Sequence, residues 1–209
     1  DIWENYSSEK MIKTIKRTLL EINYILNLDK VIEFGCGKEH FTPHLKKISK
    51  FLYGVDVIDE KLVSKSIDKY IKCQIEKKDS YLDDIPSETV DCIFILHVSG
   101  YGFNKGNTNF TDFKDIFENK SHRTGRYIND FRRVLKKNGI IVLIEYSLNI
   151  HLLFNKKDSI AKVNKDFKKY FPVPKISGFE NIYGKLKDDK TGPIVVLKKT
   201  WNKFNTYNQ

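Results

Sequence analysis

The stretch VIEFGCG, residues 31–37, determines how the rest of the chain is interpreted. Its first four residues form an apolar run interrupted only by Glu33, which is typical of a buried strand. Gly35 and Gly37 then favour a tight turn, because glycine has no Cβ and lets the backbone approach a ligand closely. A strand, a glycine turn and a helix often begin a nucleotide-binding βαβ unit, although the same turn also occurs without a ligand.

An acidic residue ends the next apolar run. Asp56 lies 19 residues after Gly37 and is followed by Val57. In a doubly wound sheet this spacing places the carboxylate beside the glycine turn, where it can accept hydrogen bonds from both hydroxyls of a ribose. A competing interpretation makes Asp56 the N-cap of the following helix, a role that Asp59 fills equally well.

Short apolar runs alternate with segments of helical period, which predicts a mostly parallel sheet with helices on both faces. The predicted strands are 30–34, 51–56, 71–75, 90–97 and 140–146, and the predicted helices are 9–26, 41–50, 59–69 and 125–137. Two more strands, 179–186 and 194–199, flank a turn-forming stretch and predict a hairpin. The expected fold is α/β: a doubly wound, seven-stranded, mostly parallel sheet with one antiparallel strand from the C-terminal hairpin.

The length of 209 residues predicts a single domain, 1–209, with a polar, aromatic-rich insertion at 100–124 that covers the substrate. The sequence has no apolar run of membrane-spanning length, no paired cysteine spacing and no histidine ligand motif. We therefore expect a cytoplasmic protein without a metal site or a membrane partner. The net charge of +10 favours an anionic partner, but a composition rich in Lys, Ile and Asn explains it equally well.

Several marks together resemble the class I (Rossmann-like) S-adenosylmethionine (SAM)-dependent methyltransferases, most closely the type 11 group of small-molecule enzymes. The marks are Glu33 with the glycine turn, Asp56, Asp79 after the third strand, and LKKNGIIV at 135–142. The likeness covers residues 31–146 and the terminal hairpin. It implies that SAM is the cofactor.

The resemblance also implies which residues bind each part of SAM. Glu33 lies near the methionine amino group, the glycines pass under the methionine and ribose, Asp56 binds the ribose, and Asp79 contacts the adenine. The implied cofactor-binding residues are Glu33, Gly35, Gly37, Asp56, Val57, Asp79, Ser80 and His97.

The chain departs from the family pattern just after the glycine turn. Glu39 stands where the family usually has a third small residue, and His40 stands where dinucleotide enzymes need Gly or Ala. Bulky side chains there crowd a pyrophosphate but need not crowd SAM, which carries no phosphate. The departure favours methyl transfer over a nicotinamide-dependent dehydrogenase.

His97, at the end of the fourth predicted strand, is the candidate catalytic base. A histidine with a pKa near ~6.5 can accept a proton at neutral pH, which a hydroxyl acceptor requires. The alternative is a structural histidine that packs over the cofactor.

The candidate acceptor-binding residues are Tyr101, His122, Arg123, Arg126, Tyr146 and His151. The aromatic residues and His151 follow the fourth and fifth strands, where they either line a pocket or simply pack as a lid. The basic group at 122–126 is either a clamp for phosphate or carboxylate or a solvated start of a helix.

We therefore expect methyl transfer to an oxygen or nitrogen of a small, anionic acceptor, phosphorylated or nucleotide-linked. A second interpretation is an RNA or tRNA methyltransferase, favoured by charge. Against it, residues 97–101 read HVSGY, without the N-P-P-Y-type motif typical of enzymes that methylate base amines. A third is a catalytically degenerate methyltransferase-fold binding subunit, which Glu39 keeps open.

Overall fold

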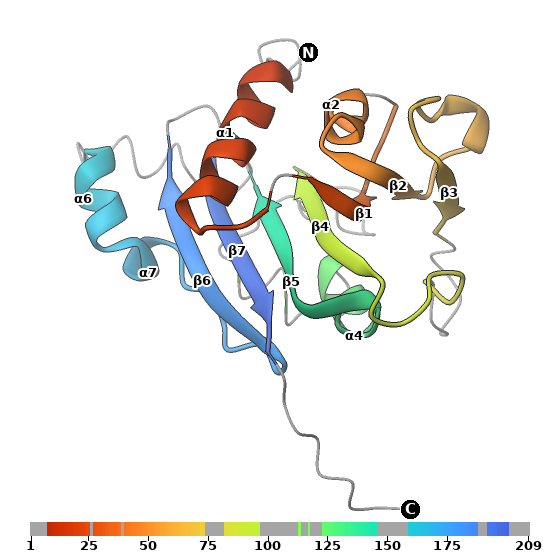
Figure 1. The fold of residues 1–209 in the computed structure, drawn as a ribbon. Coiled ribbons are helices and arrows are strands. Elements are labelled where there is room, and N and C mark those ends of the chain that lie inside the picture. Colours follow the sequence, from red (N-terminus) through yellow and green to blue (C-terminus); the bar gives the residue numbers. More distant parts are fainter. Residues whose placement is uncertain are drawn as a thin grey trace, which may run out of the picture.

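The computed structural model describes residues 8–25, 27–38, 40–73, 82–96, 113, 117, 123–145, 159–187 and 192–200. Within them a seven-stranded sheet has the order β3-β2-β1-β4-β5-β7-β6 (Figure 1). The strands are β1 (Leu28–Phe34), β2 (Ser49–Asp56), β3 (Lys69–Lys72), β4 (Val90–Leu96), β5 (Leu135–Ile144), β6 (Phe179–Leu186) and β7 (Pro193–Lys199). The helices are α1 (Ser8–Glu21), α2 (Thr42–Lys46), the 3-10 turn η1 (Glu60–Leu62), α4 (Arg123–Val134), α6 (Ile160–Lys165) and α7 (Phe167–Tyr170).

The strand directions confirm the predicted fold class. β1 is parallel to β2 and β4, β2 is parallel to β3, and β4 is parallel to β5. β7 is antiparallel to both β5 and β6 and is therefore the one reversed strand. The crossover connections produce the parallel strands, whereas the tight hairpin between β6 and β7 reverses the chain.

Two apolar layers cover the two faces of the sheet. α1 and α2 lie on one face, and α4, α6 and α7 lie on the other (Figure 1). Successive residues of a strand face opposite layers: Val31 packs with α1 and α2, and Ile32 packs with α4. All seven residues of β4 are buried, as expected for a strand covered on both sides. In the described part of the chain, no helix combines the length and the apolar composition needed to cross a membrane.

The first helix is shorter than the predicted 9–26. α1 ends at Glu21, and Asn23 adopts a left-handed conformation with φ 53°. The amide of Tyr24 then donates to the Leu19 carbonyl at 2.8 Å, which satisfies a carbonyl of the last turn. Asn23 therefore ends the helix although the apolar period continues beyond it.

The predicted end of the helix before the fifth strand is also wrong. α4 stops at Val134, and β5 begins directly at Leu135, five residues before the predicted strand. Asn138, followed by Gly139, adopts a left-handed conformation with φ 64°. It lies within β5 as an irregularity opposite the start of β4, so the turn residues do not mark the end of the helix.

The helix predicted for 59–69 is wrong, because only η1 forms there. Side chains in this segment bind backbone groups instead: the Ser64 hydroxyl accepts from the Ser66 amide at 3.2 Å, and Asp68 accepts from the Leu52 amide at 2.6 Å. Such bonds compete with the hydrogen bonds of a helix. They also bring β3 forward, so that it starts at Lys69 rather than 71.

The helix predicted for 41–50 is too long. β2 begins at Ser49, which pairs with Leu28 of β1, so that α2 has only the five residues Thr42–Lys46. Pro43 occupies the first turn, where its missing amide hydrogen costs no hydrogen bond. The short α2 therefore begins close to the glycine turn.

Candidate functional site

The candidate site lies at the edge of the sheet where the parallel strands end. β1 is flanked by β2 on one side and β4 on the other, and the strand order reverses between β1 and β4. Open α/β sheets bind ligands at this reversal, outside the carboxyl ends of the strands. The register pairs Phe34 with Val55, so β1 and β2 end side by side.

The glycine turn after β1 is held against β2. The amides of Gly35 and Cys36 both donate to the Val55 carbonyl, at 2.7 and 3.3 Å. Gly35 and Gly37 have φ values of 77° and 56°, a region that favours glycine. A Cβ added to Gly37 would meet no atom of the described residues within 4 Å, apart from its two chain neighbours. The turn thus presents bare backbone to open space, as a ligand cradle requires.

Asp56 links this turn to the end of β2. One carboxylate oxygen accepts from the Gly37 amide at 2.8 Å and the other from the Val57 amide at 2.6 Å. The residue is only 7% exposed. The interpretation of Asp56 as a helix cap is wrong, since Asp59 caps η1 by accepting from the Lys61 amide at 3.1 Å.

Glu33 is a buried acid with an unsatisfied oxygen. Its side chain is 2% exposed, and its Oε2 atom has no hydrogen-bond partner among the described residues. Burial raises the pKa of Glu33 to about 8; the nearby Thr42 hydroxyl opposes the rise and the Asp56 carboxylate adds to it. The folded chain therefore keeps Glu33 protonated below this pH, able to ionise when a cation approaches.

The thiol between the two glycines is not a nucleophile in this structure. Cys36 is 4% exposed, and burial raises the pKa of its thiol, with Glu33 and Asp56 adding to the rise. A cysteine acts as a nucleophile through its thiolate, which this environment disfavours. Its side chain packs near Gly54 instead.

The middle of α4 lies beside the end of β1. Phe34 makes edge contacts with Tyr127 and Phe131 of α4, with ring centroids 4.9 and 5.0 Å apart. Arg123 and Arg126 belong to the first turn of α4. Their side chains lie outside the described residues.

Most of the other predicted site residues also fall outside the described part of the chain, so their roles stay predictions. They are Asp79, Ser80, His97, Tyr101, His122, Tyr146 and His151, together with most of the insertion at 100–124. Glu39 lies outside it as well. Of the proposed cofactor-binding residues, the structure brings together Glu33, Gly35, Gly37, Asp56 and Val57.

Two further polar residues at the carboxyl ends of the parallel strands were not predicted from the sequence. Glu145 follows β5 directly and is 2% exposed, and Thr42 at the start of α2 is fully buried near Glu33. An acidic residue directly after an apolar strand, the same signal that singled out Asp56, identifies Glu145. Thr42 carries no such signal in the sequence, and its position near Glu33 follows only from how α2 packs against the sheet.

Comparison with solved structures shows which fold this is. The N-methyltransferase NodS from Bradyrhizobium japonicum, in complex with S-adenosylhomocysteine (SAH), matches with a TM-score of 0.51 and 13% identity, over 94% of this chain and 90% of that one. The Burkholderia thailandensis 1,6-didemethyltoxoflavin N1-methyltransferase, with bound 1,6-didemethyltoxoflavin and SAH, matches with a TM-score of 0.51 and 10% identity, over 96% and 82%. A putative type 11 methyltransferase from Sulfolobus solfataricus matches with a TM-score of 0.48 and 17% identity, over 87% and 89%.

No protein-family model and no curated protein matches the sequence. NodS and the toxoflavin enzyme are both N-methyltransferases, and both were solved with SAH. The chain has the class I SAM-dependent methyltransferase fold, as the sequence resemblance implies.

Proposed function

We propose that this chain binds SAM and transfers its methyl group to an oxygen or nitrogen of a small, anionic acceptor. The observation that carries the proposal is the open space over Gly37, beside an Asp56 carboxylate fixed by two backbone amides. The ribose of SAM lies there and donates its hydroxyl hydrogens to Asp56. Val57 contacts the nucleoside, and Asp79 and Ser80 hold the adenine.

The residues at the end of β1 suit the other end of SAM. The methionine part carries an ammonium group, and Glu33 offers an unsatisfied, buried carboxyl oxygen. The ammonium group of bound SAM would favour the ionised form of the Glu33 carboxylate and offset the cost of burying its charge. Gly35 leaves room for the methionine backbone, because glycine has no Cβ.

The main contribution of the protein to catalysis is to align the acceptor with the methyl group of SAM. When bound, SAM supplies a methyl group on a positively charged sulfur, and transfer needs the acceptor in line with that bond and shielded from water. The turn at residues 35–37 and Asp56 orient the nucleoside, and the insertion at 100–124 covers the acceptor. His97 accepts the proton of a hydroxyl acceptor.

The acceptor lies between the ends of β4 and β5 and the first turn of α4. Tyr101, Tyr146 and His151 line it, while the basic group at 122–126 binds its phosphate or carboxylate. The contacts of Phe34 with Tyr127 and Phe131 support this placement, because they hold α4 against the end of β1.

Gly37→Ala is expected to weaken SAH binding about tenfold or more. The added methyl meets no protein atom, so it enters the space assigned to the ligand. The left-handed φ of 56° costs about 1 kcal/mol of stability in addition. Calorimetric titration and thermal unfolding measure the two effects separately.

Gly184→Ala is the matched control for this variant. Its methyl would lie 2.6 Å from the Phe167 ring, far from the cofactor edge, and overpacking costs about 1–3 kcal/mol of stability. We expect weaker folding but unchanged SAH affinity. If both alanine variants bind SAH as the parent does, the space over Gly37 is not the ligand site.

The reaction itself is tested with SAM labelled in its methyl group. The chain is incubated with labelled SAM and with a cell extract that supplies candidate acceptors, both its macromolecules and its small molecules. Asp56→Ala is the inactive control. We expect label in molecules small enough to pass an ultrafiltration membrane. Label in RNA would favour the RNA methyltransferase instead, and SAH binding without any transfer would identify a degenerate binding subunit.

A further inference from the structure

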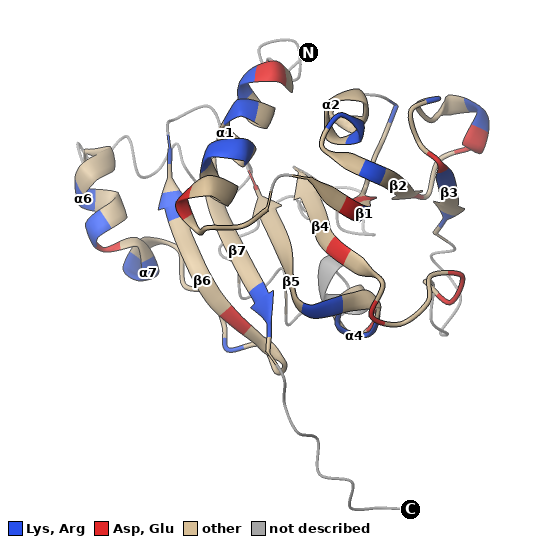
Figure 2. Cartoon of the chain, viewed as in Figure 1, with Lys and Arg blue, Asp and Glu red and all other residues tan. Residues whose placement is uncertain are grey.

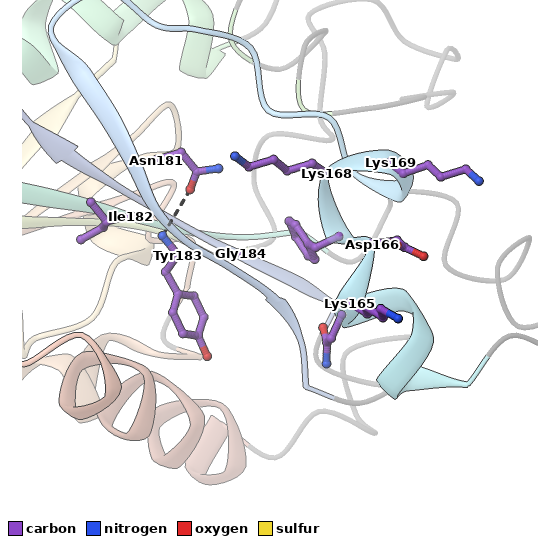
Figure 3. A pocket seen from close by; sticks show the side chains of 10 residues that line it. Lys165, Asp166, Lys168, Lys169, Asn181, Ile182, Tyr183 and Gly184 are labelled. Carbon is purple, nitrogen blue, oxygen red and sulfur yellow. Dashed lines mark hydrogen bonds between the residues drawn. The ribbon is translucent and has the colours of Figure 1, made fainter.

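A pocket lies beside β6, the outermost strand on one side of the sheet. It has a volume of about 520 Å³ and is lined by α6, α7 and the middle of the edge strand β6 (Figure 3). β6 lies four strand positions from β1, so the pocket is roughly 19 Å from the glycine turn across the sheet. It therefore lies outside the proposed cofactor site.

The outer edge of β6 offers unpaired backbone groups to this pocket. Asn164 of α6 covers one position of the edge: its amide group donates to the Leu186 carbonyl at 2.9 Å and accepts from the Leu186 amide at 2.7 Å. The Leu186 backbone groups thus point away from β7. Because the direction alternates along a strand, the amide of Gly184 points the same way, into the pocket that Gly184 lines.

Two side-chain donors face each other in the same pocket. The Asn181 side-chain oxygen accepts from the Tyr183 amide at 3.3 Å, which turns the Asn181 NH₂ group toward Lys168. Figure 3 shows Lys168 extending toward that NH₂ group. Neither group can accept a hydrogen bond from the other, and Lys168 has no ion-pair partner among the described residues. An anionic acceptor placed between them would receive hydrogen bonds from both groups.

The surroundings are positively charged. Four lysines and one acidic residue occupy α6, α7 and the residue between them: Lys162, Lys165, Lys168, Lys169 and Asp166. Figure 2 marks basic residues in blue on both of these helices. Asp166 points away from the gap between Lys168 and Asn181 (Figure 3). The local charge therefore favours an anion in that gap.

We propose that this pocket binds a small organic phosphate, held by the Lys168 ammonium, the Asn181 NH₂ group and the Gly184 amide. Phosphate oxygens accept several hydrogen bonds at once and pair with an ammonium as a point charge. The volume is that of a site for a small molecule and leaves room for the organic part. The site is independent of the proposed methyl transfer.

The test is an NMR titration of the isotope-labelled full chain with ribose 5-phosphate in buffer of physiological ionic strength. We expect saturable shifts of the Asn181 side-chain NH₂ and Gly184 amide signals, and no shift with ribose. Asn181→Asp keeps the acceptor for the Tyr183 amide but replaces the donor by a negative oxygen. This variant and Lys168→Met should each weaken binding about tenfold or more. Lys61→Met, at an exposed lysine on η1, is the matched control and should bind as the parent does.

Three results would overturn the proposal. The first is unchanged affinity in Asn181→Asp while its other amide signals match the parent. The second is a weak, unsaturated drift of signals near all exposed lysines, which indicates an adventitious ion only. The third is an RNA 12-mer that shifts the Asn181 and Gly184 signals when ribose 5-phosphate does not, which would make this face a nucleic-acid surface.

Discussion

Asp56→Ala is expected to weaken SAH binding by about a hundredfold or more. The carboxylate would accept two hydrogen bonds from the ribose, and each bond to a charged group contributes about 1.5–3 kcal/mol. The variant also releases the amides of Gly37 and Val57, which Asp56 holds at 2.8 and 2.6 Å. The ligand thus loses both its partner and the shape of the turn. Calorimetric titration of SAH into parent and variant measures the difference.

Asp29→Ala is the matched control. Asp29 is an exposed carboxylate near the amino end of β1, paired with Lys50 at 2.7 Å, on the edge of the sheet opposite the glycine turn. Its removal should leave SAH affinity within about twofold, because surface ion pairs contribute little. Circular dichroism checks that both variants fold. Equal SAH affinities for folded Asp56→Ala and Asp29→Ala would remove Asp56 from the site.

Glu33→Gln is expected to change how the stability of the free protein depends on pH. In the unfolded chain Glu33 loses its proton near its ordinary pKa of 4.5, whereas in the folded chain burial raises that pKa to about 8. Between these values the folded chain holds one more proton, so the stability contributed by protonated Glu33 is complete below pH 4.5 and is lost as pH rises through 8. The loss is on the order of 4 kcal/mol. Glutamine carries no such proton.

Urea unfolding at pH 5 and pH 8.5 tests this linkage. The stability difference between Glu33→Gln and the parent should shift in favour of the variant by several kcal/mol at the higher pH. Because the parent and the variant share all other titrating groups, the effect of those groups on stability cancels in the difference. Glu9→Gln, at an exposed glutamate of α1, should show no such shift. Parallel curves for Glu33→Gln and the parent would mean that Glu33 ionises normally in the folded chain.

The sequence predicts the parts of this fold that depend on local signals. The apolar run before Gly35 marked β1, and the turn-forming residues between two strands marked the β6–β7 hairpin. The helix predicted for 59–69 failed because the Ser64 and Asp68 side chains bind backbone groups, one of them in β2. Helical period alone does not reveal such a competing partner far along the chain.

The same distinction holds for the site. Residue spacing was enough to place Asp56 beside Gly37, because strand and turn lengths fix that geometry. The protonation of Glu33 depends on how α2 covers it. The gap between Lys168 and Asn181 depends on α7 packing beside β6, two segments whose relative position follows only from the folded sheet. These features required the structure.

A SAM site at the ends of β1 and β2 should be visible in an amide NMR spectrum of the isotope-labelled chain titrated with SAH. We expect saturable shifts of the Gly37 and Val57 amide signals, with the Gly184 amide on β6 unaffected. No change at Gly37 or Val57 with millimolar SAH would contradict it.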